Sequence, residues 1–530
     1  MAQPSSSTPA DGKTTSVRTD TLAGSTMLIL ALTPLQRLVG IGRAIAVAAL
    51  LDPAELGQWD LAFAFLSLSA PLAVLGLPGS FGRYVERYAQ LGQLRTLLRR
   101  TIGFSAALGG LFMAAVVIAR PTFSTIIFGI PGRESLVLMV AAVLGTVIVC
   151  NFLGSLLSAL RLYRAFTAQQ FAFSILFALL SIVLVLCWKQ SVMAIVVAYG
   201  GASLLTAAGS ALSIGRVWRG LPQDSDRITH WNLWSTLLPF SMCVWLTDVA
   251  TNLLYMMDRY MLVHYSSASS HEVLGWVGQY HCARIVPNVL TTVAYMGAAM
   301  LTPHLAQKWE AGLRETVAKD LRFILKLASL TLTLASVAFL LLAEIGLGLG
   351  LAHKYAQSVA VLPGALLCGV WLGLVGIAQN YTWCTERAWS SCLVLVPGIV
   401  LNVLASFFLV PRFGLYGCVM AAVAAHLVVV VLTLVTNRGL GLRWNRTTAM
   451  IVLLPAALML GGCWGSLLVL VALAAVARSE LFFNREEKAV LVEHYRQNLH
   501  KILRVFQTQL RRRGEAAFHD VPALEHSAAQ

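Results

Sequence analysis

Residues 50–88 read LLDPAELGQWDLAFAFLSLSAPLAVLGLPGSFGRYVERY. No charged side chain occurs from Leu61 to Gly82, and about 20 apolar residues suffice for a helix to cross a bilayer. The run does not alternate between apolar and polar residues, so it indicates a helix and not a barrel strand. Similar runs recur along all 530 residues, of which only 12% are charged, against about 25% in soluble domains. The sequence therefore predicts an all-α polytopic membrane protein.

The apolar runs predict about 14 transmembrane helices. They cover 22–50, 59–81, 101–119, 136–159, 168–187, 191–214, 236–263, 276–304, 326–350, 359–384, 389–409, 415–436, 446–461 and 463–479. The last two are short and separated by a glycine-rich turn, so a single long span is the alternative there. No long loop is left for an extramembrane domain, so we expect the protein to act within the bilayer.

Lys and Arg residues predict the orientation. With a cytoplasmic N-terminus, 30 of the 39 fall in inner segments, 5 in outer loops and the other four inside spans. This bias follows the positive-inside rule and places both termini in the cytoplasm. A single last span would put the basic C-terminal segment outside, so the bias favours a hairpin at 446–479. The net charge of +15 is thus explained by loops of a protein in the cell (inner) membrane, and we expect no nucleic-acid partner.

Two short matches suggest an internal repeat. Leu56-Gly57 opens the second span and Leu274-Gly275 the eighth, while Arg164-Ala165 precedes the fifth span and Arg387-Ala388 the eleventh. Both pairs of matching segments are six spans apart. An offset of six spans keeps both copies in the same orientation, which indicates parallel repeats. We therefore predict a six-helix lobe at 22–214, a second at 236–436, a central cavity between them, and the C-terminal hairpin.

The chain ends are predicted to lie outside the bundle. Residues 1–21 and 514–530 lack periodicity and are expected to be disordered, the former as a cytoplasmic tail. Residues 484–513 predict a basic amphipathic helix, because apolar residues recur there at steps of three and four. We expect this helix to lie on anionic lipids of the inner leaflet; a partner protein is the alternative.

Ionisable side chains inside the spans are the candidate functional residues, because each costs roughly 2.5–3.5 kcal/mol to insert. The first span carries Arg37 and Arg43, and Gln36 shares the stripe of Arg43 because a step of seven makes nearly two turns. Asp248 lies near the middle of the seventh span and Arg284 in the eighth. We expect Arg37, Arg43, Arg284 and Gln36 to bind substrate. Asp248 either pairs with one of the arginines or lies in a polar cavity.

The outer end of the seventh span carries Asp258 and Arg259, which are candidates for ion coupling or for an ion pair in the cavity. Asp60 is expected to cap the second span near the interface. Three arginines at depth against one well-buried carboxylate would leave surplus positive charge. Guanidinium groups bind phosphate bidentately and stay charged, so the cavity suits an anionic substrate such as a lipid pyrophosphate. The nine cysteines form no CxxC pair, and we expect no metal site, cofactor or catalytic residue.

Several motifs resemble the polysaccharide-biosynthesis and O-antigen flippase family of the multidrug/oligosaccharidyl-lipid/polysaccharide exporter superfamily. The first is the turn at 51–55 with Gly57, followed by the closing segment 75–77 and Arg83. Others are Asp258-Arg259, the segment 277–280, Leu301-Thr302-Pro303 with His304, and Tyr416-Gly417. One departure from the family pattern is Asp52, at a turn position where the family more often has glycine. The likeness covers roughly 22–436.

The resemblance implies a flippase with a MATE-like fold that moves an undecaprenyl-pyrophosphate-linked glycan to the outer leaflet by alternating access. Arg37 and Arg43 would line its cavity, the last two spans could form a groove for the lipid tail, and glycan-assembly membrane proteins are candidate partners. A peptidoglycan-precursor (lipid II) flippase and an ion-coupled drug antiporter are the alternatives. The antiporter should depend on Asp248 and the flippase on the arginines. An enzyme is disfavoured by the short outer loops, and no P-loop ATPase motif occurs.

Overall fold

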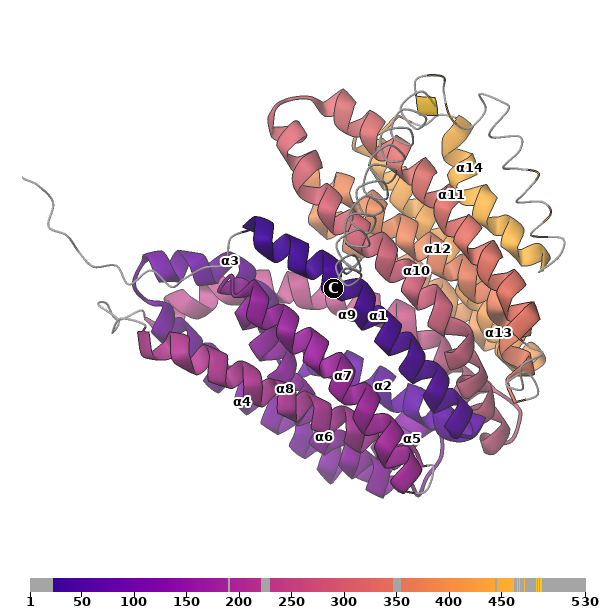
Figure 1. The fold of residues 1–530 in the computed structure, drawn as a ribbon, viewed down its shortest axis with the longest axis horizontal. Coiled ribbons are helices and arrows are strands. Elements are labelled where there is room, and N and C mark those ends of the chain that lie inside the picture. Colours follow the sequence, from indigo (N-terminus) through magenta and orange to yellow (C-terminus); the bar gives the residue numbers. More distant parts are fainter. Residues whose placement is uncertain are drawn as a thin grey trace, which may run out of the picture.

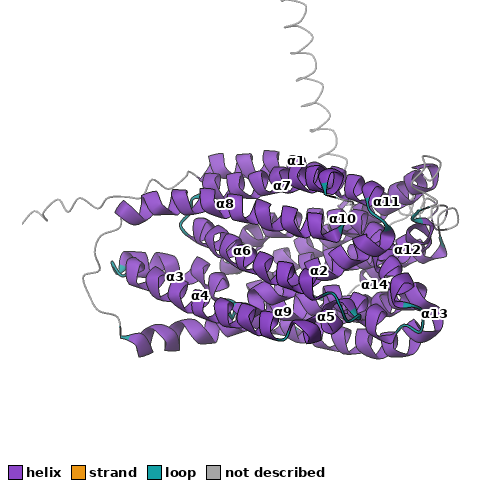
Figure 2. Ribbon diagram, turned by 90° about the horizontal axis from the view of Figure 1, so that it is seen from below, coloured by secondary structure: helices purple, strands orange, loops and turns teal. Residues whose placement is uncertain are grey.

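The computed structural model describes residues 22–188, 191–220, 229–346, 354–443 and 446–461, with isolated positions between Gly465 and Lys488. Within these ranges the chain is almost wholly helical and contains no strand (Figure 2). Nine of the described helices are long and apolar enough to cross a membrane, and one bent pair raises this to ten. The protein is thus an all-α, multi-pass membrane protein, as predicted.

The first half of the chain forms eight helices. They are α1 (Leu22–Leu50), α2 (Pro53–Ala73), α3 (Leu77–Gln90), α4 (Leu94–Ile118), α5 (Arg120–Phe128), α6 (Glu134–Ala159), α7 (Tyr163–Cys187) and α8 (Val192–Gly220). The second half forms α9 (His230–Tyr265), α10 (Ser270–Glu310), α11 (Arg314–Gly346), α12 (Ala356–Cys384), α13 (Ala388–Gly439), α14 (Arg446–Ala456) and the 3₁₀ turn η2 (Ala457–Leu460). The first twelve predicted spans correspond, in chain order, to helices α1–α13. Helices α2 and α3 share one span, α13 contains two, and α5 corresponds to none. The span at 446–461 coincides with α14 and η2, and that at 463–479 lies outside the described ranges.

The second predicted span, 59–81, is broken in the structure. Leu75 and Gly76 take the left-handed conformation, with φ of 48° and 62°, and α2 and α3 meet there at a bend of 44°. A Cβ at Gly76 would lie 2.8 Å from the Cβ of Trp245 on α9, so the break also allows close approach of a neighbouring helix. Gly414 likewise takes a non-helical conformation, with φ of 53°, and divides α13 into two parts. These parts correspond to the two spans predicted at 389–409 and 415–436.

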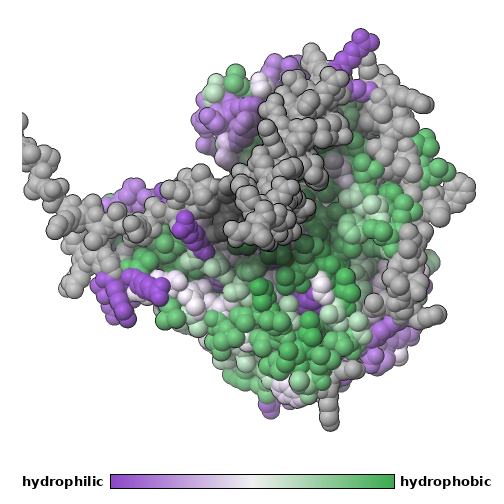
Figure 3. Space-filling view, viewed as in Figure 1, coloured by the Kyte–Doolittle hydropathy of each residue, from purple (hydrophilic) through white to green (hydrophobic). Residues whose placement is uncertain are grey.

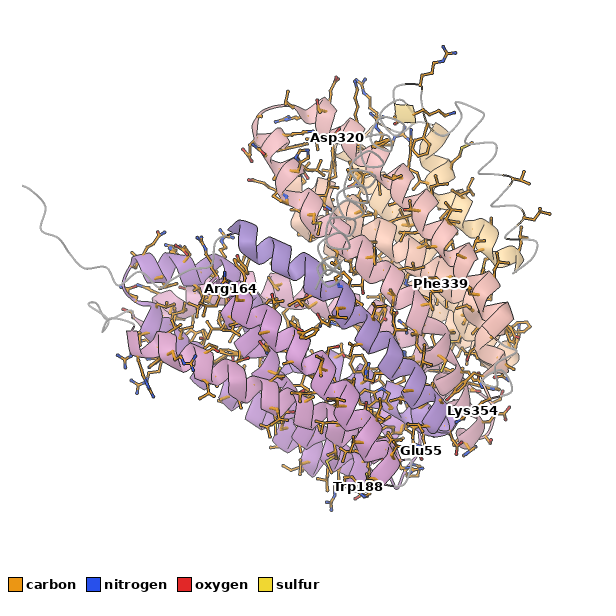
Figure 4. All side chains as sticks on the ribbon, in the orientation of Figure 1. Glu55, Arg164, Trp188, Asp320, Phe339 and Lys354 are labelled. Atoms are coloured by element: carbon orange, nitrogen blue, oxygen red, sulfur yellow. The ribbon has the colours of Figure 1, made fainter. Side chains whose placement is uncertain are left out.

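The helices form two groups that diverge from one end of the molecule. In Figure 1, α1–α8 make one group and α10–α14 the other, while α9 contributes to both. The loops at 91–93 and 311–313, which Arg95 and Arg314 flank, lie at one end of the molecule. We call this end the basic end and the opposite end the far end. In Figure 4, Glu55 and Lys354 lie near each other at the far end, whereas Arg164 and Asp320 lie on separate arms. Figure 3 shows the surface hollowed between the arms.

Two glycines allow α2 and α10 to cross in direct backbone contact near the far end. A Cβ at Gly57 would overlap the carbonyl oxygen of Leu274, and one at Gly278 would overlap that of Pro53. The two contacts are reciprocal, since each glycine meets the carbonyl that lies one helical turn before the other glycine. The structure therefore matches Gly57 with Gly278. The repeat seen in the sequence alone matches it with Gly275, almost one turn earlier.

Further contacts hold the far end together. The Tyr355 hydroxyl at the start of α12 donates to the carbonyl of Ala48 at 2.9 Å and is 3.3 Å from that of Leu51, at the end of α1. Towards the basic end, α9 packs on α3, where the Tyr84 hydroxyl donates to the Thr236 carbonyl at 3.2 Å. The helix groups are thus joined at the far end, and α9 also contacts the first group along α3.

Two described positions of the C-terminal segment, Phe483 and Glu487, contact α11, where the Phe483 ring lies 6.0 Å from that of Phe323. The Lys326 ammonium on α11, which is 4% exposed, donates to the Glu487 carboxylate at 2.9 Å. Lys326 lies towards the basic end of α11, the end at which α14 begins. The hairpin at 446–479 stays a prediction, because the span at 463–479 lies outside the described ranges. Apart from a few positions at its start, the predicted amphipathic helix at 484–513 lies outside the described ranges, as do both tails.

Candidate functional site

A buried ion network joins the two helix groups where α2, α9 and α10 meet. The Asp60 carboxylate on α2 is 1% exposed and contacts two cationic or polar groups of the other helices. Its Oδ2 lies 2.8 Å from Nε of Arg259 on α9, and its Oδ1 lies 2.6 Å from Nδ1 of His281 on α10. Because an ionised carboxylate only accepts hydrogen bonds, Nδ1 of the histidine donates. The network thus crosses between the groups at the same end as the glycine contact.

The network continues through Asp258 to Arg284. The Asp258 carboxylate accepts a hydrogen bond of 2.6 Å from the Tyr280 hydroxyl and one of 3.0 Å from the Arg259 backbone N–H. Nη1 of Arg284 lies 3.9 Å from Asp258 Oδ1, and Nη2 donates to the Tyr255 carbonyl at 3.0 Å. The Arg284 guanidinium also lies 3.9 Å above the Tyr255 ring. We use the name buried ion network for Asp60, Asp258, Arg259, His281 and Arg284.

The polar residues of α1 lie outside this network. Gln36 fixes α1 against α7, since its side-chain amide donates to the Gln170 carbonyl and its own carbonyl accepts from Ser174. The Arg43 guanidinium lies 3.9 Å above the Phe177 ring of α7, in a cation–π contact. Arg37 is exposed. Among the described residues, no carboxylate lies within ion-pair distance of either arginine.

Asp248 does not form the ion pair that the sequence allowed with Arg284 or Arg37. Its side chain is exposed on α9, and no cationic group of the described residues lies within ion-pair distance. Only its backbone carbonyl is engaged, by the Asn252 amide one turn later at 2.9 Å. Among the described residues Asp248 is thus without an ion-pair partner, and its place in a polar cavity stays a prediction.

The charge balance differs from the one expected from the sequence. Asp60 does not cap α2 near the interface: it lies two turns into the helix and pairs with Arg259. Together with Asp258, it supplies two buried carboxylates for the two buried arginines, so the buried ion network is balanced apart from His281. Since buried charges persist when they are paired, this part of the site is suited to holding helices together. Of the candidate arginines Arg37, Arg43 and Arg284, the first two have no carboxylate partner among the described residues.

Sequence reasoning missed His281, Tyr255 and Tyr280. Each is a single residue in an apolar helix, and nothing local marks it as a partner of a charge. Counting the carboxylates inside spans could have pointed to them, because Asp60 and Asp258 require hydrogen-bond donors when they are buried. Among the described residues, no group of three or more His, Cys, Asp or Glu could hold a metal ion.

Comparison with known proteins identifies the family. Residues 22–309 match the family described as polysaccharide biosynthesis protein. No curated protein sequence matches the chain.

Solved structures share the fold at low sequence identity. A lipid II flippase MurJ in an inward closed conformation matches with a TM-score of 0.61 and 14% identity, over 85% of this chain and 98% of that one. An inward-facing multidrug resistance MATE family transporter of the MOP superfamily gives 0.55 and 14%, over 78% and 97%. The Vibrio cholerae MATE transporter VcmN in its bent form gives 0.52 and 11%, over 79% and 97%. The fold is thus that of MurJ and the MATE transporters, as predicted.

Proposed function

Because this chain belongs to the polysaccharide biosynthesis protein family, we propose that it is a flippase. Its substrate would be a polyprenyl-pyrophosphate-linked oligosaccharide, which it moves from the cytoplasmic to the outer leaflet of the cell (inner) membrane. The protein would act as a transporter and not as an enzyme.

The observation that carries this proposal is the pair of α1 arginines without carboxylate partners among the described residues. Helix α1 runs along the boundary between the two helix groups (Figure 1), and Arg37 and Arg43 lie in its middle and outer parts. Placing free guanidinium groups inside a membrane is costly, and a pyrophosphate is a ligand that would compensate for that cost. The polyprenyl tail would stay in the lipid while the headgroup crosses.

The places where the two groups touch support alternating access as the mechanism of this proposal. The far end is held by the α2–α10 crossing and the buried ion network, while the arms diverge at the basic end. With the basic end in the cytoplasm, this is a conformation open to the cytoplasm. Export requires the contacts between Asp60 and its partners Arg259 and His281 to separate, so that the far end opens while the basic arms approach.

The proposal is tested by flipping of a fluorescent undecaprenyl-pyrophosphate-linked sugar in proteoliposomes. We expect Arg37→Gln and Arg43→Gln each to slow flipping at least tenfold, and Asp248→Asn to leave most of it. Wild-type protein that fails to flip the lipid-linked sugar would refute the proposal. If only Asp248→Asn abolishes transport, and the cargo is a cationic drug driven by an ion gradient, the antiporter alternative is correct.

The cargo and the partners are further parts of this proposal. The flippase in the structural comparison is named for lipid II, so lipid II is the alternative cargo, and its flipping rate can be compared with that of other lipid-linked glycans. Anionic lipids would bind the basic helix at 484–513, and glycan-assembly membrane proteins would deliver the substrate. A liposome series with and without anionic lipid tests the first of these expectations.

A further inference from the structure

A second polar cavity lies inside the first helix group, away from the buried ion network. It has a volume of about 860 Å³ and is an open recess lined by residues of α3, α6, α7 and α8, which belong to the first helix group in Figure 1. This volume is within the range of about 300–1,000 Å³ that is typical of small-molecule sites. On α6 and α7 the cavity lies in the half of each helix towards the basic end, where Arg161 marks its edge.

The cavity wall is rich in uncharged hydrogen-bonding groups. Among the residues that line it are the amides and hydroxyls of Asn151, Ser155, Ser158, Gln169, Gln170 and Ser203. Gln169 is 7% exposed, and its Nε2 donates to the Cys150 carbonyl at 2.9 Å. Its Oε1 is buried without any hydrogen-bond partner. Leaving a buried polar atom unpaired costs about 1–3 kcal/mol, so Gln169, which lines the cavity, carries a carbonyl oxygen whose need for a hydrogen-bond donor is unmet.

The rest of the wall determines which ligand chemistry fits. Arg161 is the one charged side chain among the lining residues that the structure describes, and it pairs with Glu86. With no carboxylate in the described wall a cation is not favoured, and an anion would find no free cation there. The rings of Phe166, Phe173 and Tyr199 supply apolar faces among the polar groups. Amides, hydroxyls and ring faces together match a sugar, which presents hydroxyl groups around its edge and C–H groups on its face.

The cavity adjoins the arginines of α1. The Phe177 ring that lies under Arg43 also packs edge-on against Tyr199, with ring centroids 5.0 Å apart. Gln170, in the cavity wall, accepts the hydrogen bond from Gln36. A ligand whose charged group lies at Arg43 therefore has an uncharged, polar cavity directly beside it.

We infer that this cavity binds the neutral sugar residues next to the pyrophosphate of the lipid-linked glycan. The inference rests on the proposed function, and it adds where the glycan is recognised. The cationic part of the site, on α1, binds a group common to all such lipids. The amide wall at Asn151 and Gln169 distinguishes one sugar from another.

The experiment compares two ligands that differ only in the sugar. Full-length protein in nanodiscs is titrated with undecaprenyl diphosphate and with undecaprenyl diphosphate that carries one N-acetylhexosamine. We expect the sugar to tighten binding about tenfold in the wild type. Gln169→Met, which keeps the side-chain length but removes the amide, should abolish that gain and leave binding of the bare lipid unchanged. Asn151→Leu should do the same, and because Asn151 is exposed to the cavity it places little demand on folding.

Gln58→Met is the matched control. Gln58 is equally buried, at 2% exposed, and its Oε1 also lacks a partner, but it does not line the cavity. The control should keep the tenfold gain. Equal wild-type affinity for the two lipids would overturn the inference and leave the proposed function standing, whereas binding of neither lipid would refute both. Loss of the gain in Gln58→Met as well as in Gln169→Met would also overturn it.

Discussion

Replacing Asp60 with asparagine should open the far end of the molecule. The substitution keeps the shape of the side chain and removes its charge. In the wild type the carboxylate lies 2.8 Å from Arg259 Nε and 2.6 Å from His281 Nδ1. Because Asp60 belongs to the first helix group and His281 on α10 to the second, the contact between Asp60 and His281 exists only while the far end is closed.

The magnitude follows from the burial of the pair. Arg259 is 3% exposed, and its Nη1 already lacks a hydrogen bond. Removing one partner of a buried ion pair costs about 3–5 kcal/mol, because the remaining charge stays desolvated. Opening the far end would return Arg259 to water and relieve this cost. At about 1.4 kcal/mol per tenfold change, the equilibrium between the closed and open far end should shift roughly 10²- to 4 × 10³-fold towards the open state.

The assay measures the separation of the basic arms by electron spin resonance. Spin labels are attached through Gln90→Cys on α3 and Lys319→Cys on α11, both exposed, in a background in which the exposed Cys187 and Cys243 are serine. When the far end opens, the arms approach, so Asp60→Asn should shorten the label-to-label distance. An unchanged distance distribution in a folded Asp60→Asn protein would refute the reasoning.

Two control variants distinguish this opening of the far end from a general loss of stability. Asp320→Asn removes a carboxylate that pairs with Lys308 at 2.6 Å, with both side chains about one-third exposed. Such surface pairs contribute about 0–1 kcal/mol, so the distance should stay as in the wild type. The double variant Asp60→Leu with Arg259→Met removes both charges and should restore the closed distribution, since an apolar pair of similar volume tolerates burial.

Three shorter predictions address other contacts. Gly57→Ala places a methyl group against the backbone of α10 and should cost about 1–3 kcal/mol, lowering the thermal midpoint in detergent, whereas Gly275→Ala, which meets no atom within 4 Å, should not. Arg43→Lys keeps the charge but loses the planar group stacked on its phenylalanine ring, so lipid pyrophosphate should bind several-fold more weakly in a titration; equal affinity would contradict a bidentate contact. Glu487→Gln leaves the buried Lys326 without its carboxylate, at a cost of about 1–3 kcal/mol, and should increase proteolysis of the C-terminal segment.

The helices are predicted well from sequence because one local property decides them. A long apolar run must form a helix in lipid, since its backbone has no other partners there. The apolar character of a run does not reveal where the helix backbone is broken. The bend at Leu75 and Gly76 lies inside a run that is apolar on both sides, and α5 escapes prediction because Arg120 and Pro121 give it the appearance of a loop.

The ion pairing could not be predicted in the same way. Asp60 lies far along the chain from Arg259 and His281, so their contact depends on how α2, α9 and α10 cross. Local position suggested a helix cap for Asp60, and tertiary packing decided otherwise. Gln169 carried no signal at all, because a single uncharged amide in a span usually bonds to a neighbouring helix. Its unpaired oxygen is evident only from the cavity around it.

The place at which α2 and α10 cross determines how far the rest of the molecule moves. From Gly278, helix α10 continues to Glu310, a length of about 48 Å at roughly 1.5 Å per residue. With no side chain between the two backbones, this point can act as a fulcrum, and a tilt of about 10° there would carry the opposite tip of α10 through roughly 8 Å. A slight rotation at the crossing thereby produces a large displacement at the opposite end of α10, where the headgroup of the proposed substrate would enter.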